Sequence, residues 1–90
     1  MTHKEFREYI LSFGPRSLHL LRWILLNKDY NQYFVIDPLE YMKYAKIRKI
    51  ETFEKAMREL RGSGVVRYTE KGILVAPFIY RYSHLIGKQD

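Results

Sequence analysis

Basic side chains crowd into one part of this 90-residue chain. Residues 43–71 contain nine Lys and Arg against four Glu, so they carry +5 of the total net charge of +6. Ammonium and guanidinium groups neutralise phosphates, and a local excess of them is the electrostatic footprint of a polyanionic partner. Charge alone is equally consistent with a solvated basic face that has no partner. The nine residues are Lys43, Lys46, Arg48, Lys49, Lys55, Arg58, Arg61, Arg67 and Lys71.

Two elements must position most of these cations, a helix that ends near residue 62 and a two-stranded ribbon that follows it. The helix has apolar residues at helical spacing, and Gly62-Ser63-Gly64 ends it. Two apolar runs, 65–68 and 72–77, then flank the turn Thr-Glu-Lys-Gly, which predicts a hairpin whose Gly72 adopts a positive φ. The helical residues predicted to face the core are Ile50, Phe53, Ala56, Met57 and Leu60.

A shorter helix and a short strand precede that helix. Residues 27–32 are of types that favour a turn, and the apolar run 33–36 predicts a short strand. Asp37 followed by Pro38 starts a helix over 38–45, with a side-chain acceptor at the N-cap and proline at the first helical position. The side chains predicted to point inward are Leu39 and Met42, with Tyr41 or Ala45 as a further candidate.

Two helices are predicted in the first third of the chain. The first covers residues 3–13 and has one apolar stripe, and Gly14-Pro15 ends it. The second covers 17–27 and is apolar nearly all round, so it must be covered on more than one side, by the first helix or by a partner subunit. We therefore predict a homodimer that uses the first helix. Its interface residues are Phe6, Tyr9, Ile10 and Phe13, with Tyr82, Leu85 and Ile86 as further candidates.

The predicted order is helix, short strand, helix, turn, helix and ribbon, which is the order of a winged helix-turn-helix domain. We expect an α+β fold with three or four helices and a C-terminal wing of two or three strands. All 90 residues form one domain, in which 1–14 is a candidate dimerisation element. Pro77 prevents the last strand from being a central one, so residues 78–86 either continue the strand or close over the body.

This order of elements predicts binding to double-stranded DNA. A helix fits the major groove, where arginine forms two hydrogen bonds with guanine and a threonine methyl packs on thymine. The wing reaches the DNA backbone or the adjacent minor groove. The predicted DNA-binding residues are Lys46, Arg48, Lys49, Thr52, Lys55, Arg58, Arg67 and Lys71.

Two carboxylates complicate this prediction, because negative charge near phosphates is unfavourable. Glu51 and Glu54 stand four residues before Lys55 and Arg58, so they could pair with these cations along the helix. Otherwise the wing dominates, and phosphate contacts and groove shape outweigh the reading of bases. A glutamate can also accept a hydrogen bond from cytosine.

Part of the chain also resembles known families. The stretch AMRELRGSGVVRYTEKGILV, residues 56–75, is similar to the ending of bacterial winged helices. KGILVAPFIYRYSH resembles the ending of replication proteins from small Gram-positive plasmids, although Ala76 stands where those proteins often have asparagine. The resemblance implies a protein of a plasmid or mobile element that marks an origin of replication or of conjugative transfer and recruits other proteins. A small transcriptional repressor and a protein-interaction adaptor without DNA binding remain alternatives with the same fold.

Other classes of function find less support. The histidines His3, His19 and His84 lack metal-ligand spacing, and no glycine-rich phosphate loop leads into a helix. Tyr80 and Tyr82 could act as nucleophiles on DNA only beside a bound metal, for which no ligand cluster is visible. We expect no enzymatic activity, no metal and no cofactor. Tyr30, Tyr33, Phe34, Tyr41 and Tyr44 suit either the stacking of single-stranded bases or a core with an aromatic rim.

The sequence also predicts a cytoplasmic protein without membrane contact. It has no cysteine, and its N-terminus lacks the apolar core of a signal peptide. The longest apolar concentration, 18–26, is too short to span a bilayer. The stripe on helix 3–13 is flanked by equal numbers of acidic and basic residues, so anionic lipid would attract it little.

Overall fold

A computed structural model describes residues 2–27 and 33–82, and in these ranges the chain is an α+β protein. Five helices and one two-stranded antiparallel sheet are present there, where the sequence predicted three or four helices. The turn was predicted at 27–32, but Asn27 still belongs to α2. Residues 28–32 of that turn and the candidate interface residues Leu85 and Ile86 lie outside the described residues. The elements are α1 His3–Leu11, α2 Pro15–Asn27, α3 Pro38–Ala45, α4 Ile50–Gly62, β1 Val66–Thr69, β2 Gly72–Val75 and α5 Pro77–Arg81.

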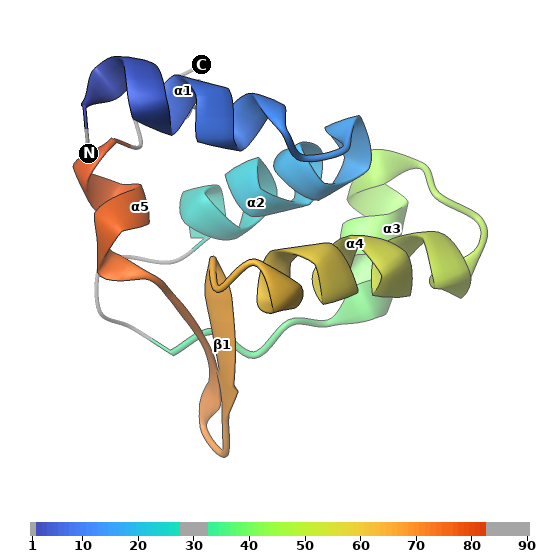
Figure 1. Ribbon diagram of the computed structural model, residues 1–90. Coiled ribbons are helices and arrows are strands. Elements are labelled where there is room, and N and C mark those ends of the chain that lie inside the picture. Colours follow the sequence, from blue (N-terminus) through green and yellow to red (C-terminus); the bar gives the residue numbers. More distant parts are fainter. Residues whose placement is uncertain (1, 28–32, 83–90) are drawn as a thin grey trace.

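Helix α2 is the centre of the core. Leu20, Leu21 and Ile24 are fully buried, because α1 lies along one side of α2 and α4 packs on another (Figure 1). Trp23 completes the cover on the side of α3, with its ring 5.1 Å from that of Tyr41. Most of the apolar side chains of α2 are therefore covered within one chain, whereas Leu26 is 57% exposed.

Helix α3 begins and ends as local chemistry predicts. The Asp37 carboxylate accepts a hydrogen bond from the Leu39 amide at 3.0 Å, and Pro38 takes the first helical position. Lys46 adopts a left-handed conformation that ends the helix. The predicted inward face was wrong in part. Tyr41 and Met42 are buried as expected, whereas the Leu39 side chain is 71% exposed.

Helix α4 presents four of its five predicted core residues to α2 and α3. Phe53, Ala56, Met57 and Leu60 are buried. The prediction for Ile50 was wrong, because this side chain at the first turn is 38% exposed. The helix runs through Gly62, and Gly64, with φ of 83°, then turns the chain into β1.

The hairpin projects away from the helices (Figure 1). Its register pairs Val66 with Val75 and Tyr68 with Ile73. The predicted strand at 33–36 is reduced to one bridge, in which Phe34 and Ile73 exchange backbone hydrogen bonds of 3.0 and 2.9 Å. This bridge ties the linker between α2 and α3 to β2, at the residue that follows Gly72 of the hairpin turn.

Gly72 should be the least replaceable glycine of the hairpin. Its φ is 130°, and a Cβ atom there would meet the Phe34 carbonyl oxygen at 2.8 Å. We expect Gly72→Ala to lower the free energy of unfolding by about 2 kcal/mol or more, since both the conformation and the space are wrong for alanine. Gly62→Ala is the control, because a Cβ atom there meets nothing within 4 Å. Equal urea midpoints for the two variants would contradict this prediction.

The segment after Pro77 forms α5 and packs on the body. It does not continue the strand, and of the two predicted alternatives the closing segment is the one observed. Phe6 of α1 stacks on Tyr82, with ring centroids 4.8 Å apart, and its edge meets Phe78 at 6.3 Å. Phe6 is 0% exposed and Ile10 is also buried.

The predicted dimer interface therefore needs correction. Phe6, Ile10 and Tyr82 are buried within one chain, so they could meet a partner only if α5 moved away from α1. Tyr9 and Phe13 are half-buried, and the Tyr9 hydroxyl donates a hydrogen bond to the Ser63 carbonyl at 3.2 Å. The apolar stripe of α1 was predicted correctly, but α5 of the same chain covers it where a partner subunit was expected.

Candidate nucleic-acid interface

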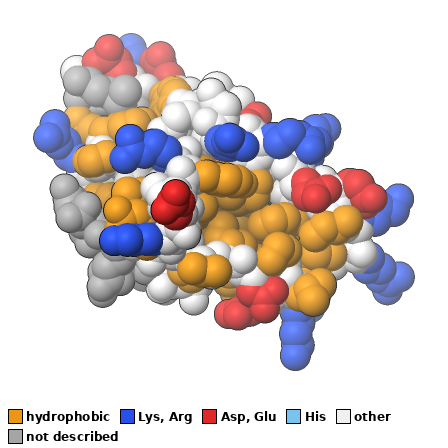
Figure 2. Space-filling view, turned by 90° about the horizontal axis from the view of Figure 1, so that it is seen from below, with side chains coloured by type: hydrophobic (Ala, Val, Ile, Leu, Met, Phe, Trp, Pro, Cys, Tyr) orange, Lys and Arg blue, Asp and Glu red, His pale blue; other side chains and the backbone are white. Residues whose placement is uncertain are grey.

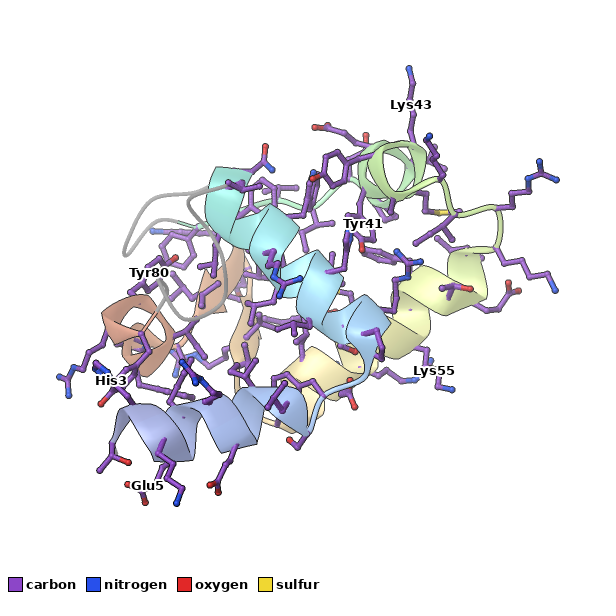
Figure 3. The ribbon with its side chains drawn as sticks, turned by 90° about the horizontal axis from the view of Figure 1, so that it is seen from above. His3, Glu5, Tyr41, Lys43, Lys55 and Tyr80 are labelled. Atoms are coloured by element: carbon purple, nitrogen blue, oxygen red, sulfur yellow. The ribbon has the colours of Figure 1, made fainter. Side chains whose placement is uncertain are left out.

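The side of α4 that faces away from the core carries basic side chains. Lys55 and Arg58 are exposed there, because their helical positions oppose those of Ala56 and Leu60. Lys55 points away from the body in Figure 3. Just before α4, the chain adds Lys46, Arg48 and Lys49, which are all exposed.

The hairpin turn fixes a further cation at its tip. The Thr69 hydroxyl donates to the Gly72 carbonyl at 2.6 Å and accepts from the Lys71 amide at 3.1 Å. The backbone of Lys71 is thereby held, and its ammonium group lies 5.6 Å from the centroid of the Tyr33 ring. Lys71 is exposed and free to meet an anion.

Two of the predicted DNA-binding residues lie apart from this set. Arg67 pairs across the ribbon with Leu74, on the opposite face from Tyr68 and Ile73, so it points away from α4. Arg67 instead lines a hollow with Gly64, Leu74 and residues 75–77. Thr52 is half-buried and, like Lys55, lines a second hollow with the first turn of α2.

The structure adds Arg61, which was counted among the cations but not predicted as a site residue. Its guanidinium carbon lies 4.6 Å from the centroid of the Tyr68 ring on β1. This cation–π contact joins the last turn of α4 to the ribbon. The sequence could have indicated Arg61, because it follows Arg58 by three residues and both side chains therefore lie on one edge of the helix.

Figure 2 shows the face of the molecule from which the hairpin projects. Lys and Arg side chains border this face, and hydrophobic side chains fill its middle. Glu51 and Glu54 of α4 are also exposed, so the outer side of the helix has mixed charge. The cations are therefore arranged around the rim of this face.

A second cluster joins α2 to α3 on another side of the molecule. His19 Nδ1 lies 2.8 Å from the Tyr41 hydroxyl, which points toward α2 (Figure 3). Burial, with Arg16 and Arg22 as smaller causes, lowers the pKa of His19 below its ordinary value of 6.5. Burial also raises the pKa of Tyr41, so both groups are neutral at physiological pH. This contact supports the core interpretation of Tyr41 over a stacking role.

The His19 contact predicts a pH dependence. Because the pKa of His19 is lowered on folding, the unfolded chain takes up the proton first, and stability falls as the pH drops below about 6.5. The variant His19→Gln cannot take up that proton. We expect urea unfolding to show a smaller loss of stability for this variant than for the parent chain between about pH 7 and pH 5.5. Equal losses would show that His19 contributes nothing to the pH dependence.

The described residues contain neither a metal-binding cluster nor a membrane-spanning helix. Across 2–27 and 33–82, no group of three or more His, Cys, Asp or Glu is placed to hold a metal ion. None of the helices in these ranges has the length and apolar composition needed to cross a bilayer. His84 lies outside the described part of the chain.

Comparisons with known proteins assign this chain to no family. No family model, curated protein or solved structure matches this chain. Its function has to be inferred from its own geometry.

Proposed function

We propose that this chain is a winged helix-turn-helix protein that binds double-stranded DNA without catalysing a reaction. The observation that carries the proposal is the basic helix α4 beside a hairpin that projects from the body and has Lys71 at its tip. In a winged helix-turn-helix domain, α3 and α4 are the helix pair and the ribbon is the wing. The bridge between Phe34 and Ile73 supplies the third strand position of such a fold.

The roles follow from the exposed cations. Helix α4 enters the major groove, where Arg58 and Lys55 reach base edges or the flanking phosphates. Lys46, Arg48 and Lys49 neutralise phosphates at the beginning of the helix, and Lys71 does so at the wing. With acidic residues also on α4, phosphate contacts and groove shape contribute more to binding than base reading does.

The resemblance of residues 71–84 to plasmid replication proteins extends the proposal. The DNA site would be an origin of replication or transfer in a mobile element, and the protein would recruit partners there. A repressor uses the same contacts at a promoter, and only the position of the DNA site distinguishes the two. A homodimer would need an interface other than Phe6 and Ile10, because these side chains are buried within one chain.

The proposal is tested by titrating a fluorescein-labelled random duplex with the full chain at several salt concentrations. Each neutralised phosphate contributes about −0.9 to the slope of log K against log salt, so four to six contacts predict a slope between roughly −3.5 and −5.5. Selection of bound genomic fragments then locates any specific site, at an origin or at a promoter. Absence of binding at low salt would refute the proposal.

A further inference from the structure

A groove with an apolar floor lies between α4 and β1. This open hollow has a volume of about 330 Å³, and its floor consists of Phe53 and Met57 from the helix and Tyr68 from the strand. Ile50 precedes Phe53 by three residues on the same edge of α4 and extends the apolar surface by about one helical turn. Figure 2 shows hydrophobic side chains across this part of the face.

The floor has the chemistry of a site for an apolar side chain. Tyr68 is 47% exposed, and Phe53 and Met57 are buried at the bottom of the hollow. A DNA backbone has no apolar group to fill such a space, whereas a leucine or phenylalanine side chain gains free energy by leaving water there. The volume lies at the lower end of the range for small ligand sites, so it suits one or two anchoring side chains.

The walls of the groove select an anionic occupant. Arg58 and Arg61 line it together with a single carboxylate, Glu54. The contact with the Tyr68 ring orients the Arg61 guanidinium, and an oriented guanidinium binds a carboxylate through two parallel hydrogen bonds. The surrounding stretch 43–71 has a net charge of +5, which adds a longer-range attraction.

We propose that this groove docks an acidic amphipathic helix of a partner protein. One or two apolar side chains of the partner would fill the hollow over Tyr68, and its carboxylates would pair with Arg58 and Arg61. This is helix-in-groove recognition, and so small a groove predicts a Kd of about 10–100 μM. The inference goes beyond DNA binding. Because Arg58 serves both surfaces, the acidic helix and the duplex compete for the protein.

The probe is a fluorescein-labelled helical peptide of about 16 residues, with leucines on one face and glutamates on the others. We expect it to bind the full chain, and we expect its glutamine counterpart to bind at least about 10-fold more weakly. Tyr68→Ser should weaken peptide binding about 10-fold, whereas Tyr44→Ser should change it less than about 2-fold. Tyr44 is the matched control, because it is an exposed tyrosine that packs near His19 and Trp23 on α2.

Three results would overturn the docking proposal. They are the absence of peptide binding at about 1 mM protein, equal binding of the acidic and neutral peptides, and equal binding to the Tyr68→Ser and Tyr44→Ser variants. Circular dichroism of both variants shows whether the fold is intact. The same variants are titrated with duplex DNA, so the two proposals are separable. Duplex binding without peptide binding refutes the docking site alone, and peptide binding without duplex binding refutes the DNA function alone.

Discussion

Replacing Lys55 and Arg58 together with glutamine should weaken binding to duplex DNA by about 100-fold at physiological salt. Both side chains lie on the open side of α4, opposite its buried face. Their loss removes two cationic contacts, so the slope of log K against log salt should also become shallower by about 2. Glutamine has a helix propensity similar to that of lysine and arginine, so the loss of DNA affinity reports on the loss of charge more than on a change in folding. Anisotropy titrations at three salt concentrations measure both quantities.

The matched control replaces Lys4 and Arg7 with glutamine. Both residues are exposed on α1, and either double variant lowers the net charge from +6 to +4. If only net charge governed binding, the two variants would lose affinity equally. The proposed interface predicts that the α1 variant stays within about threefold of the parent chain, because its cations lie far from the duplex and are screened. Equal losses would remove the case for α4 as the DNA-binding element.

Replacing Phe6 with alanine should destabilise the protein by about 3–5 kcal/mol. Phe6 is fully buried and stacks on Tyr82, so truncation leaves a cavity between α1 and α5. Domains of this size have total stabilities of roughly 5–15 kcal/mol, so the variant would lose a large share of its stability. The change is measured by urea unfolding followed by circular dichroism.

Leu11→Ala is the control in the same helix, since Leu11 is 71% exposed. We expect it to change the free energy of unfolding by less than about 0.5 kcal/mol. The pair also distinguishes a core residue from an interface residue. If Phe6 belonged to a dimer interface, Phe6→Ala would lower the mass in solution and leave a folded monomer. A folded monomer of unchanged stability would contradict the burial of Phe6 within one chain.

The elements that the sequence predicted correctly are those whose ends are determined by neighbouring residues in the chain. Asp37 and Pro38 determine the start of α3 through one side-chain acceptor and one constrained φ angle. Gly72 marks the hairpin turn, because few other residues tolerate a φ of 130°. These signals lie within a few residues of the structure that they specify, so periodicity and turn chemistry suffice to find them.

The predictions that failed depended on contacts between distant residues. The stripe of α1 was identified, but its cover is α5, more than 60 residues later in the chain. Leu39 and Ile50 fit the apolar period of their helices, but each sits at a helix start that extends beyond the core. The direction of Arg67 depends on the register of the ribbon, and a shift of one residue reverses it.

The candidate site was predictable in composition but not in arrangement. The excess of cations in residues 43–71 is visible in the sequence. Their separation into the α4 side, the hairpin tip and the opposite face of the ribbon appears only when the elements are packed. The groove between α4 and Tyr68 likewise has no local signal, because its floor and walls come from two elements joined by a turn.

The most direct test of the DNA-binding face is a ¹⁵N–¹H correlation spectrum of the full chain during titration with a duplex. The account predicts that amide signals of α4, of the Lys46–Lys49 turn and of the hairpin tip around Lys71 shift or broaden. Signals of α1 and α5 should stay in place, because α1 lies on the opposite side of the body from the hairpin tip and α5 lies beside the N-terminal end of α1 (Figure 1). Shifts confined to α1 and α5, or no shifts at all at low salt, would contradict the assignment of α4 and the hairpin as the DNA-binding surface.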